Sequence, residues 1–388
     1  MDRPKALVAC LPDPSRNPRP YRAIWLLHRR GYEVSVFSPR PCKTVVEISH
    51  ILPMRDQPRW RLLAVAQRIL IYGFGVVQVA FFPVLLERLK WRIWGGAPVL
   101  RMISDGCFDV VIVEDLQLLP GVLDARRCNV RVLFDAREYA PRELEGSLAF
   151  CLFHQPLIRR QLQLCLHRVD SFYTVCQSLA DEYQREFGFK PSVVRSTPFY
   201  ADLSPTPSQV SPVRLVHHGN ANRDRGLRSM IDVIRSMGGR YTLDFYLVGN
   251  RAHLAELIAS AAGCDWISFR RPIAFDRLVP ALSAYDAGFY LLQPTGFNTY
   301  YALPNKFFEF IQARLAVITG PSPEMEKLIR HYGVGAVSAD FSVASMVDLL
   351  RGLTSEQINA MRANAVVAAR DLCWERESEA LARCLDRA

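Results

Sequence analysis

The sequence lacks the patterns that mark several common classes of protein. Its 10 cysteines include no Cys-x-x-Cys pair, so a zinc or redox site has little support, and free thiols in a reducing cytosol are the better interpretation. The start of the chain runs directly into an apolar stretch at 6–11, without the pattern of a signal peptide. It contains no zinc finger, no RNA-binding aromatic motif and no basic tail, so nucleic acid is not an expected partner.

Two ligand-binding motifs are missing as well. No Gly-x-Gly-x-x-Gly follows the first apolar stretch, so the sequence has no dinucleotide fingerprint. No Asp-x-Asp occurs anywhere, so we expect no metal and no other cofactor. What the chain does have is a net charge of +10, which indicates an attraction to phosphates of a nucleotide, a membrane or a nucleic acid.

Strand and helix signals alternate through the whole chain, which at 388 residues is long enough for two domains. A Pro- and Ser-rich stretch at 201–212 separates the two halves. The alternation predicts an α/β protein of two facing, Rossmann-like, doubly wound domains, with a last helix that packs back across both. The expected strands lie at 6–11, 33–37, 108–115, 130–135, 171–175, 192–195, 214–218, 242–248, 267–269, 287–292 and 315–319.

Residues 59–94 are unusual for an α/β domain. Within them, 69–86 form an 18-residue run without a charge, flanked on both sides by Arg, Lys and Trp. The length reaches the threshold for a membrane span, but two glycines, a glutamine and a proline interrupt it. Three interpretations stay open: helices that lie on an anionic bilayer or face the acceptor, ordinary core helices, or a true span.

The most informative stretch is 303–310. Pro304 lacks an N–H and suits the start of a helix, and Lys306 and Glu309 then lie three residues apart on one helical face. A cation and backbone N–H groups at a helix start bind anions, and a carboxylate one turn on can hold a diol. A phosphate and a sugar diol at that separation describe a nucleotide. An ordinary surface pair of Lys306 and Glu309 is the alternative.

A second candidate cluster follows the expected strand at 130–135. Charged residues at the C-terminal end of a strand in an open α/β sheet lie where ligands bind. Asp135, Arg137 and Glu138 are therefore candidates for the reaction centre. The alternative is a capping and salt-bridge cluster at the start of the next helix.

Four stretches together resemble the GT-B-fold glycosyltransferases, and within them the retaining glycosyltransferase family 4 and its bacterial polysaccharide relatives. They occur in the order of that family over nearly the whole chain. The stretches are Phe134–Tyr139, His217–Leu227, Ala302–Glu309, and the apolar strand at 315–319 closed by Gly320–Glu324.

The resemblance implies a nucleotide-sugar-dependent enzyme of the hexosyltransferase type. It would transfer a sugar to a glycan or lipid-linked acceptor in bacterial surface polysaccharide or glycoconjugate synthesis, retaining and metal-independent. Residues 1–200 would be the acceptor-side domain, 213–365 the nucleotide-sugar-binding domain, and 366–388 the returning helix. Such a protein is expected in the cytoplasm, peripheral on the inner face of the cell membrane if 59–94 lie on the bilayer.

The resemblance also implies roles for single residues. Gly219 would let its loop approach the donor diphosphate, Arg225 and Lys306 would bind that diphosphate, and Glu309 would hold the ribose hydroxyls. Asp135, Arg137 and Glu138 would face the reaction centre from the other domain. The implied donor-binding residues are Gly219, Asn220, Arg223, Arg225, Asn298, Tyr301, Pro304, Asn305, Lys306 and Glu309.

Three positions depart from the family pattern. Tyr301 stands where the first acid of the family's paired glutamates would be, Arg137 replaces a common His, and Asn220 replaces a common Arg, with Arg223 nearby to supply that charge. The alternative function is therefore a catalytically degenerate GT-B protein that binds nucleotide or glycan without transfer. A sugar-nucleotide epimerase on the same fold is a further alternative.

Overall fold

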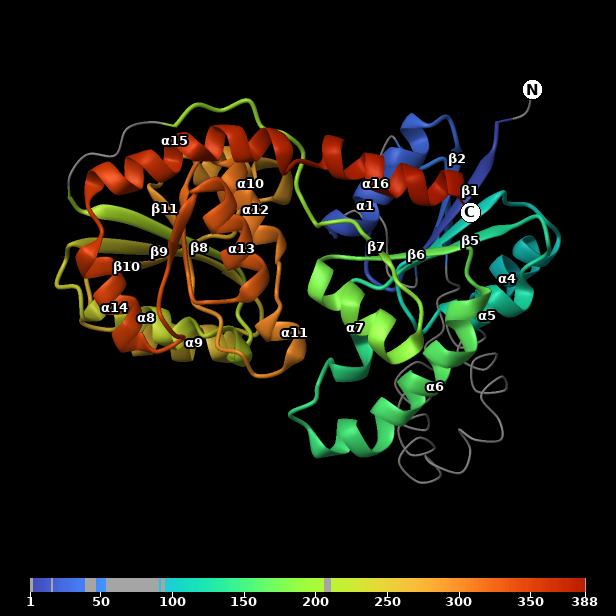
Figure 1. The fold of residues 1–388 in the computed structure, drawn as a ribbon, viewed down its shortest axis with the longest axis horizontal. Coiled ribbons are helices and arrows are strands. Elements are labelled where there is room, and N and C mark those ends of the chain that lie inside the picture. The colour runs from blue at the N-terminus through green and yellow to red at the C-terminus, as the bar shows by residue number, and fades with distance from the viewer. Residues whose placement is uncertain are drawn as a thin grey trace. The chain divides into compact units, whose positions relative to one another are not determined.

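The computed structural model describes residues 3–14, 17–38, 47–53, 91, 95–205 and 211–387. The chain forms two compact units, Met1–Val194 with Ser378–Ala388, and Arg195–Glu377 (Figure 1). Each unit is a parallel sheet with helices on its faces. This arrangement confirms the predicted α/β class with two Rossmann-like doubly wound sheets.

The sheet of the first unit has the order β3-β2-β1-β4-β5-β6-β7, and all its strand pairs are parallel. The order changes direction between β1 and β4, which is where ligands bind in open α/β sheets. Its strands are β1 (Lys5–Ala9), β2 (Glu33–Ser38), β3 (His50–Pro53), β4 (Val110–Val113), β5 (Arg131–Asp135), β6 (Ser171–Thr174) and β7 (Ser192–Val193). The helices of this unit are α1 (Pro18–Arg29), α4 (Ala97–Ser104), α5 (Leu119–Ala125), α6 (Gln155–Cys165) and α7 (Gln177–Phe187).

The sheet of the second unit has the order β10-β9-β8-β11-β12-β13, again all parallel, with its change of direction between β8 and β11. Its strands are β8 (Val213–Asn220), β9 (Tyr241–Val248), β10 (Ile267–Arg270), β11 (Ala287–Tyr290), β12 (Ala316–Thr319) and β13 (Gly335–Val337). Its helices are α8 (Leu227–Arg235), α9 (Arg251–Ser260), α10 (Phe275–Leu282), α11 (Phe297–Tyr300), α12 (Asn305–Gln312), α13 (Pro323–Tyr332), α14 (Val343–Gly352) and α15 (Ser355–Asp371). The last helix, α16 (Trp374–Arg387), begins in this unit and ends in the first.

Helix α12 is fixed to the second sheet by close packing on a glycine. Four of its eight residues, from Phe307 to Ile311, are buried aromatic or aliphatic side chains. A Cβ built on Gly288 of β11 would lie 2.1 Å from the ring of Phe310, so the ring occupies the space that any side chain at Gly288 would need. This contact sets the position of α12 and, with it, of Lys306 and Glu309.

A buried ion pair ties the long helix α15 to the start of the same sheet. Asp286, just before β11, accepts hydrogen bonds from Arg214 and, at 3.2 Å, from Nη1 of Arg362 on α15. The side chains of Arg362 and Asp286 are each 1% exposed. Breaking a buried pair leaves an uncompensated charge, so this pair restricts how α15 can pack.

Three details of the sequence interpretation need correction. The helix expected over 366–388 is two helices, because Leu372 adopts φ −101° and ψ 57° and ends α15 before α16 starts. No glycine or proline marks that break. The sequence also predicts a helix over 144–167, whereas the structure has a π-helical segment at Phe150–His154 ahead of α6. The edge strands β3 and β13 were not expected, since they are short and lie at the edges of their sheets.

Residues 59–94, for which three interpretations were left open, lie almost entirely outside the described residues. The middle of the expected linker at 201–212 lies outside them as well. Among the residues that are described, no helix combines the length and the apolar character needed to cross a bilayer.

We predict that Gly288→Ala lowers the free energy of unfolding by about 1–3 kcal/mol, because overpacking forces Phe310 and α12 away from β11. The matched control is Gly352→Ala at the end of α14, where a Cβ would meet nothing within 4 Å. The control should leave the free energy of unfolding unchanged or raise it slightly. Denaturant titration of both variants is the measurement, and equal stability of the two would contradict the packing argument.

Candidate functional site

The candidate donor site lies at the C-terminal ends of β8 and β11, where the second sheet changes direction. Gly219 is near the end of β8 and has φ +125°, which side chains rarely adopt. A Cβ at this position would lie 3.0 Å from Nζ of Lys306. The glycine therefore leaves room for the lysine at the edge of the sheet, and two predicted site residues meet.

The ammonium of Lys306 is held among aromatic and imidazole rings. Its Nζ lies 4.6 Å from the centroid of the Tyr290 ring and 3.2 Å from Nε2 of His217. Burial and the charge of Arg225 lower the pKa of Lys306 to about 7, and Glu309 opposes this shift. A lysine so placed would gain much from an arriving anion, because a diphosphate would supply the negative charge that the site lacks.

Glu309 lies one turn after Lys306 on α12 and is 7% exposed. One of its carboxylate oxygens, Oε2, is 3.2 Å from Nε2 of His218. Pro304 caps the helix with φ −79° and ψ 157°, and Asn305 is its first residue. A cation, a helix start and a carboxylate thus follow one another along α12, as the sequence predicted for a nucleotide.

The other predicted donor residues are more dispersed. Arg225 acts on Lys306 and His217, since its charge lowers the pKa of both. Arg223 extends from a short 3-10 turn to Glu256 on α9, with 2.7 Å between Nη2 and Oε1. Asn220 is the exposed last residue of β8, Asn298 lies in α11, and Tyr301 caps the end of that helix.

In the first unit, Asp135 at the end of β5 is 2% exposed and bound by Arg19 of α1. Nη2 of Arg19 donates to Oδ1 of Asp135 at 2.7 Å, and Nη1 donates to the carbonyl of Val194 at 3.0 Å. The guanidinium also lies over the ring of Tyr173. Asp135 is thus engaged by an arginine, and its catalytic role stays a prediction.

Glu114 lies beside this pair and is 1% exposed. Burial and the neighbouring Asp135 raise the pKa of Glu114 well above its ordinary value. The neutral form of Glu114 is therefore favoured beside the paired carboxylate of Asp135. The three side chains form a buried set with one cation, one anion and one neutral acid.

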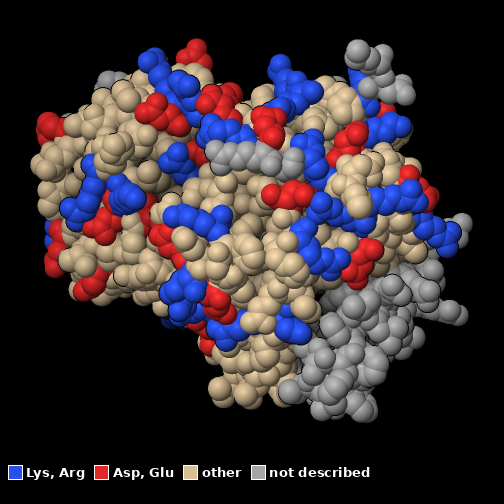
Figure 2. All heavy atoms as spheres, turned by 45° about the vertical axis from the view of Figure 1, so that its right-hand side comes forward, with Lys and Arg blue, Asp and Glu red and all other residues tan. Residues whose placement is uncertain are grey.

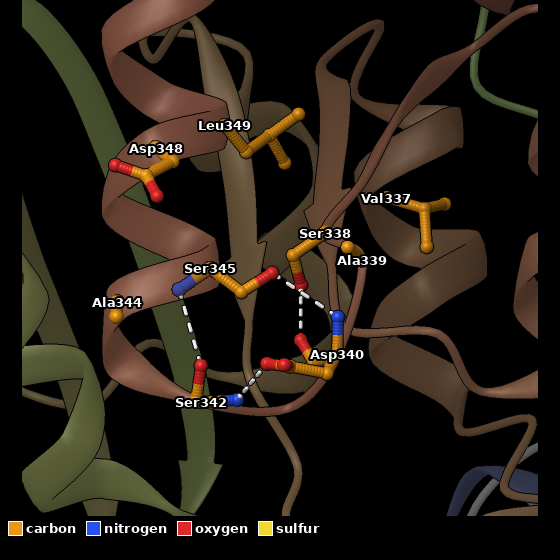
Figure 3. Close-up of a pocket in the computed structure, with 9 residues that line it drawn as sticks. All are labelled: Val337, Ser338, Ala339, Asp340, Ser342, Ala344, Ser345, Asp348 and Leu349. Atoms are coloured by element: carbon orange, nitrogen blue, oxygen red, sulfur yellow. Dashed lines mark hydrogen bonds between the residues drawn. The ribbon is translucent and has the colours of Figure 1, made fainter.

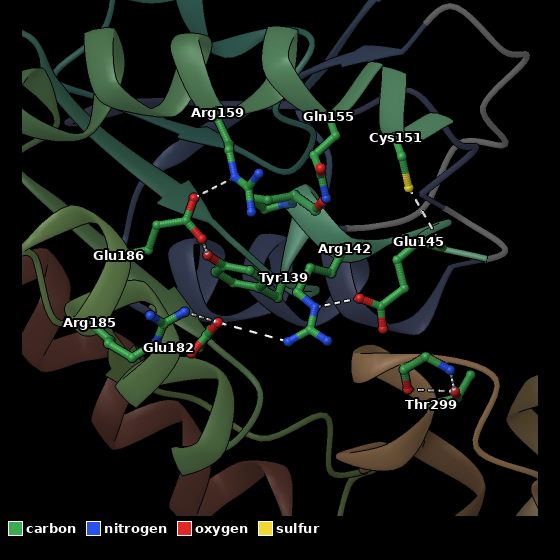
Figure 4. A network of polar contacts seen from close by, with 12 residues as sticks. Tyr139, Arg142, Glu145, Cys151, Gln155, Arg159, Glu182, Arg185, Glu186 and Thr299 are labelled. Atoms are coloured by element: carbon green, nitrogen blue, oxygen red, sulfur yellow. Dashed lines mark hydrogen bonds and ion pairs between the residues drawn. The ribbon is translucent and has the colours of Figure 1, made fainter. Parts of the chain in front are cut away.

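Arg137 and Glu138 follow on the turn after β5. Nη2 of Arg137 binds Oδ1 of Asp115 at 2.8 Å, while the side chain of Glu138 is exposed. The hydroxyl of Tyr183 on α7 donates to the carbonyl of Glu138 at 2.8 Å. Figure 4 shows the network that continues from this turn to α6 and α7, in which Tyr139 and Arg159 both bind Glu186.

Comparison with known proteins identifies the first unit. The sequence model of the family described as "Glycosyl transferase 4-like domain" matches residues 21–199. No curated protein sequence matches the chain.

Solved structures match both units of the chain together. A sucrose-phosphate synthase from Thermosynechococcus elongatus has a TM-score of 0.72 at 9% identity, with 99% of each chain covered. Alr3699/HepE of Anabaena, in complex with UDP and glucose, has a TM-score of 0.70 at 13% identity, with 98% of this chain and 99% of that chain covered. WaaG, a glycosyltransferase involved in lipopolysaccharide biosynthesis, has a TM-score of 0.65 at 12% identity, with 97% and 98% covered. The resemblance to GT-B glycosyltransferases, and the expectation of an enzyme of that class, are confirmed.

The candidate site also contains neighbours that sequence reasoning missed. His217 and His218 were assigned no role from the sequence, and the structure buries both, each in contact with a predicted donor residue. Tyr290 and, in the first unit, Arg19 were not assigned to a site either. Their common signal is position, since each histidine and Tyr290 lies at the C-terminal end of a strand that borders the switch point.

Two other features of the described surface do not add to the site. A hollow of ≈ 590 Å³ beside the start of α14 is lined by serines and aspartates that bond one another, as Figure 3 shows for Asp340, Ser342 and Ser345. On the face drawn in Figure 2, basic and acidic side chains are interspersed. Within the described ranges, no three His, Cys, Asp or Glu side chains are grouped as metal ligands.

The lowered pKa of Lys306 predicts a pH dependence of stability. The folded chain binds fewer protons than the unfolded chain between about pH 7 and the ordinary lysine pKa of 10.5, so this group raises the free energy of unfolding as pH rises through that interval. Lys306→Met removes the effect. The wild type should therefore gain stability relative to Lys306→Met from pH 7 upward in denaturant titrations.

Lys327→Met is the control, because it removes an exposed lysine of α13 in the same unit. A difference between wild type and Lys306→Met that is constant with pH would contradict the buried, partly neutral lysine.

Proposed function

We propose that the protein transfers a sugar from a nucleoside diphosphate sugar to a glycan or lipid-linked acceptor. The observation that carries this proposal is the meeting of Gly219, Lys306 and Glu309 at the switch point of the second sheet. Lys306 and Arg225 bind the diphosphate, and Glu309 binds the ribose hydroxyls. The structure of Alr3699/HepE holds UDP and glucose, which favours a UDP-sugar among the donors.

The chemistry of the site is electrostatic. Departure of the nucleoside diphosphate builds negative charge on its leaving oxygens, and cations fixed beside that charge lower the barrier. Lys306 and Arg225 supply the cations, so the proposed reaction needs no metal ion. The resemblance to family 4 supports transfer with retention of the anomeric configuration, in the synthesis of bacterial surface polysaccharide or glycoconjugate.

Thermal unfolding against UDP-, GDP-, ADP- and CMP-sugars, with and without EDTA, tests donor binding. A ligand at 100 times its dissociation constant stabilises the native state by about 2.7 kcal/mol. We expect one nucleotide to raise the midpoint, EDTA to leave that shift unchanged, and Lys306→Ala and Glu309→Ala each to abolish it. Lys327→Ala is the matched control and should keep the full shift.

The same samples distinguish the enzyme from its non-catalytic alternative. Release of free sugar or transfer to an acceptor, followed by NMR of the product anomer, supports the transferase and reports retention. A midpoint shift without any turnover would instead support a chain that binds nucleotide without transfer. Absence of any shift would overturn the proposal itself.

We also propose that the protein works at the inner face of the cell membrane as a peripheral enzyme in the cytoplasm. Three leucines spaced four residues apart, around the start of the π-helical segment, project from the first unit. Leu144, Leu148 and Leu152 are 61%, 81% and 62% exposed. An exposed apolar row of this kind suits contact with a lipid surface or a lipid-linked acceptor.

Sedimentation with anionic liposomes at low salt tests the membrane proposal. Leu148→Glu should weaken liposome binding by about tenfold, because one buried leucine contributes roughly 1.5–3 kcal/mol. Val367→Glu alters a side chain of the second unit that is 59% exposed and should bind as the wild type does. Equal binding of both variants, or equal transfer to a soluble acceptor, would contradict this assignment.

A further inference from the structure

Two adjacent histidines near the end of β8 lie beside the two side chains that the proposed function assigns to the donor. Successive residues of a strand point to opposite faces of the sheet. His217 contacts Lys306, and His218 contacts Glu309. Each donor residue therefore has its own histidine, and the two histidines are successive residues of β8.

The contacts of His217 define which of its nitrogens carries the proton. Its Nδ1 lies 2.8 Å from the carbonyl oxygen of Phe289, and a carbonyl can only accept, so Nδ1 bears the hydrogen. Burial and the charge of Lys306 lower the pKa of His217 well below its ordinary value, so the ring is neutral. Nε2 then has a free lone pair, which faces Nζ of Lys306 at 3.2 Å.

The ring of His217 is also fixed by its neighbours. It stacks on Tyr290 with ring centroids 5.8 Å apart and meets the edge of Phe245 at the same separation. The same Tyr290 ring lies under Nζ of Lys306 at 4.6 Å. The imidazole and the phenol thus hold the ammonium from two sides, with Gly219 leaving space on a third.

His218 is placed in a similar way against the carboxylate. Its ring packs edge-on against Phe310 with centroids 5.5 Å apart, and Nε2 lies 3.2 Å from Oε2 of Glu309. Burial and the charge of Lys306 lower the pKa of His218 to about 3, so this ring is neutral as well. It can contact the carboxylate without cancelling the negative charge that a ribose diol would use.

We propose that His217 and His218 are separate positioning residues, His217 for the diphosphate-binding ammonium of Lys306 and His218 for the ribose-binding carboxylate of Glu309. This inference rests on the proposed function, because it assumes a nucleoside diphosphate in the site. Neither histidine touches the donor. Each acts through one residue of α12, so the two should affect different parts of the nucleotide.

A crossed binding experiment tests this division. Dissociation constants of UDP, GDP, ADP and CDP are first measured for the wild type, and the base bound most tightly is kept. The nucleoside diphosphate, its monophosphate and its 2′-deoxy diphosphate are then titrated into the wild type, His217→Phe and His218→Phe. The ratio of monophosphate to diphosphate reports the Lys306 side, and the ratio of deoxy to ribo diphosphate reports the Glu309 side.

We expect His217→Phe to weaken diphosphate binding by about tenfold and to leave the deoxy-to-ribo ratio unchanged, because it removes one hydrogen bond to a charged group. His218→Phe should weaken binding by about fivefold and lower only the deoxy-to-ribo ratio. A general loss of packing would change both ratios together. That outcome, or wild-type ratios in both variants, would overturn the inference.

His217→Gln is a second variant, which keeps the test possible if His217→Phe does not fold. Its amide offers one donor for the carbonyl of Phe289 and one acceptor for Lys306, so it should restore part of the phosphate contribution. Equal binding by His217→Gln and His217→Phe, both folded by circular dichroism, would contradict the proposal. If the wild type binds none of the four diphosphates, the proposed function fails, which is distinguishable from failure of the histidine assignment.

Discussion

The second unit is arranged around a lysine ammonium that is held partly out of water. Lys306 loses hydration at the sheet edge, and Glu309, the ring of Tyr290 and a nitrogen of His217 compensate for part of this loss. The pKa of the lysine falls to about 7 as a result. A site in that state favours an anion, since a bound diphosphate would restore the favourable electrostatics that burial removed.

The first unit buries a charge of the opposite sign at the C-terminal edge of its own sheet. Here a carboxylate, Asp135, is buried at the end of a strand, and Arg19 reaches from α1 to neutralise it. Burial raises the pKa of Glu114 beside the pair and favours its neutral form. The charges at this end of the sheet are thus largely matched within the unit, whereas at Lys306 the proposed diphosphate would supply the balancing negative charge.

The order of elements and the residues of α12 could be read from the sequence. Apolar runs predicted most of the central strands, and Pro304 followed by Lys306 and Glu309 predicted a helix start with a cation and a carboxylate one turn apart. The short edge strands β3 and β13, and the break between α15 and α16 at Leu372, could not be read in this way. The two strands span only four and three residues, and no glycine or proline marks the break at Leu372, so tertiary packing decides these features.

The sequence by itself determined the α/β alternation and the residue types of the site, because hydrophobic period and helix capping are local properties. Only the tertiary structure decided which distant side chains meet. Lys306 and His217 are 89 residues apart, and Arg19 and Asp135 are 116 apart. Such pairs depend on the order of strands in each sheet and on the seating of Phe310 over Gly288, and no local pattern in the chain records either.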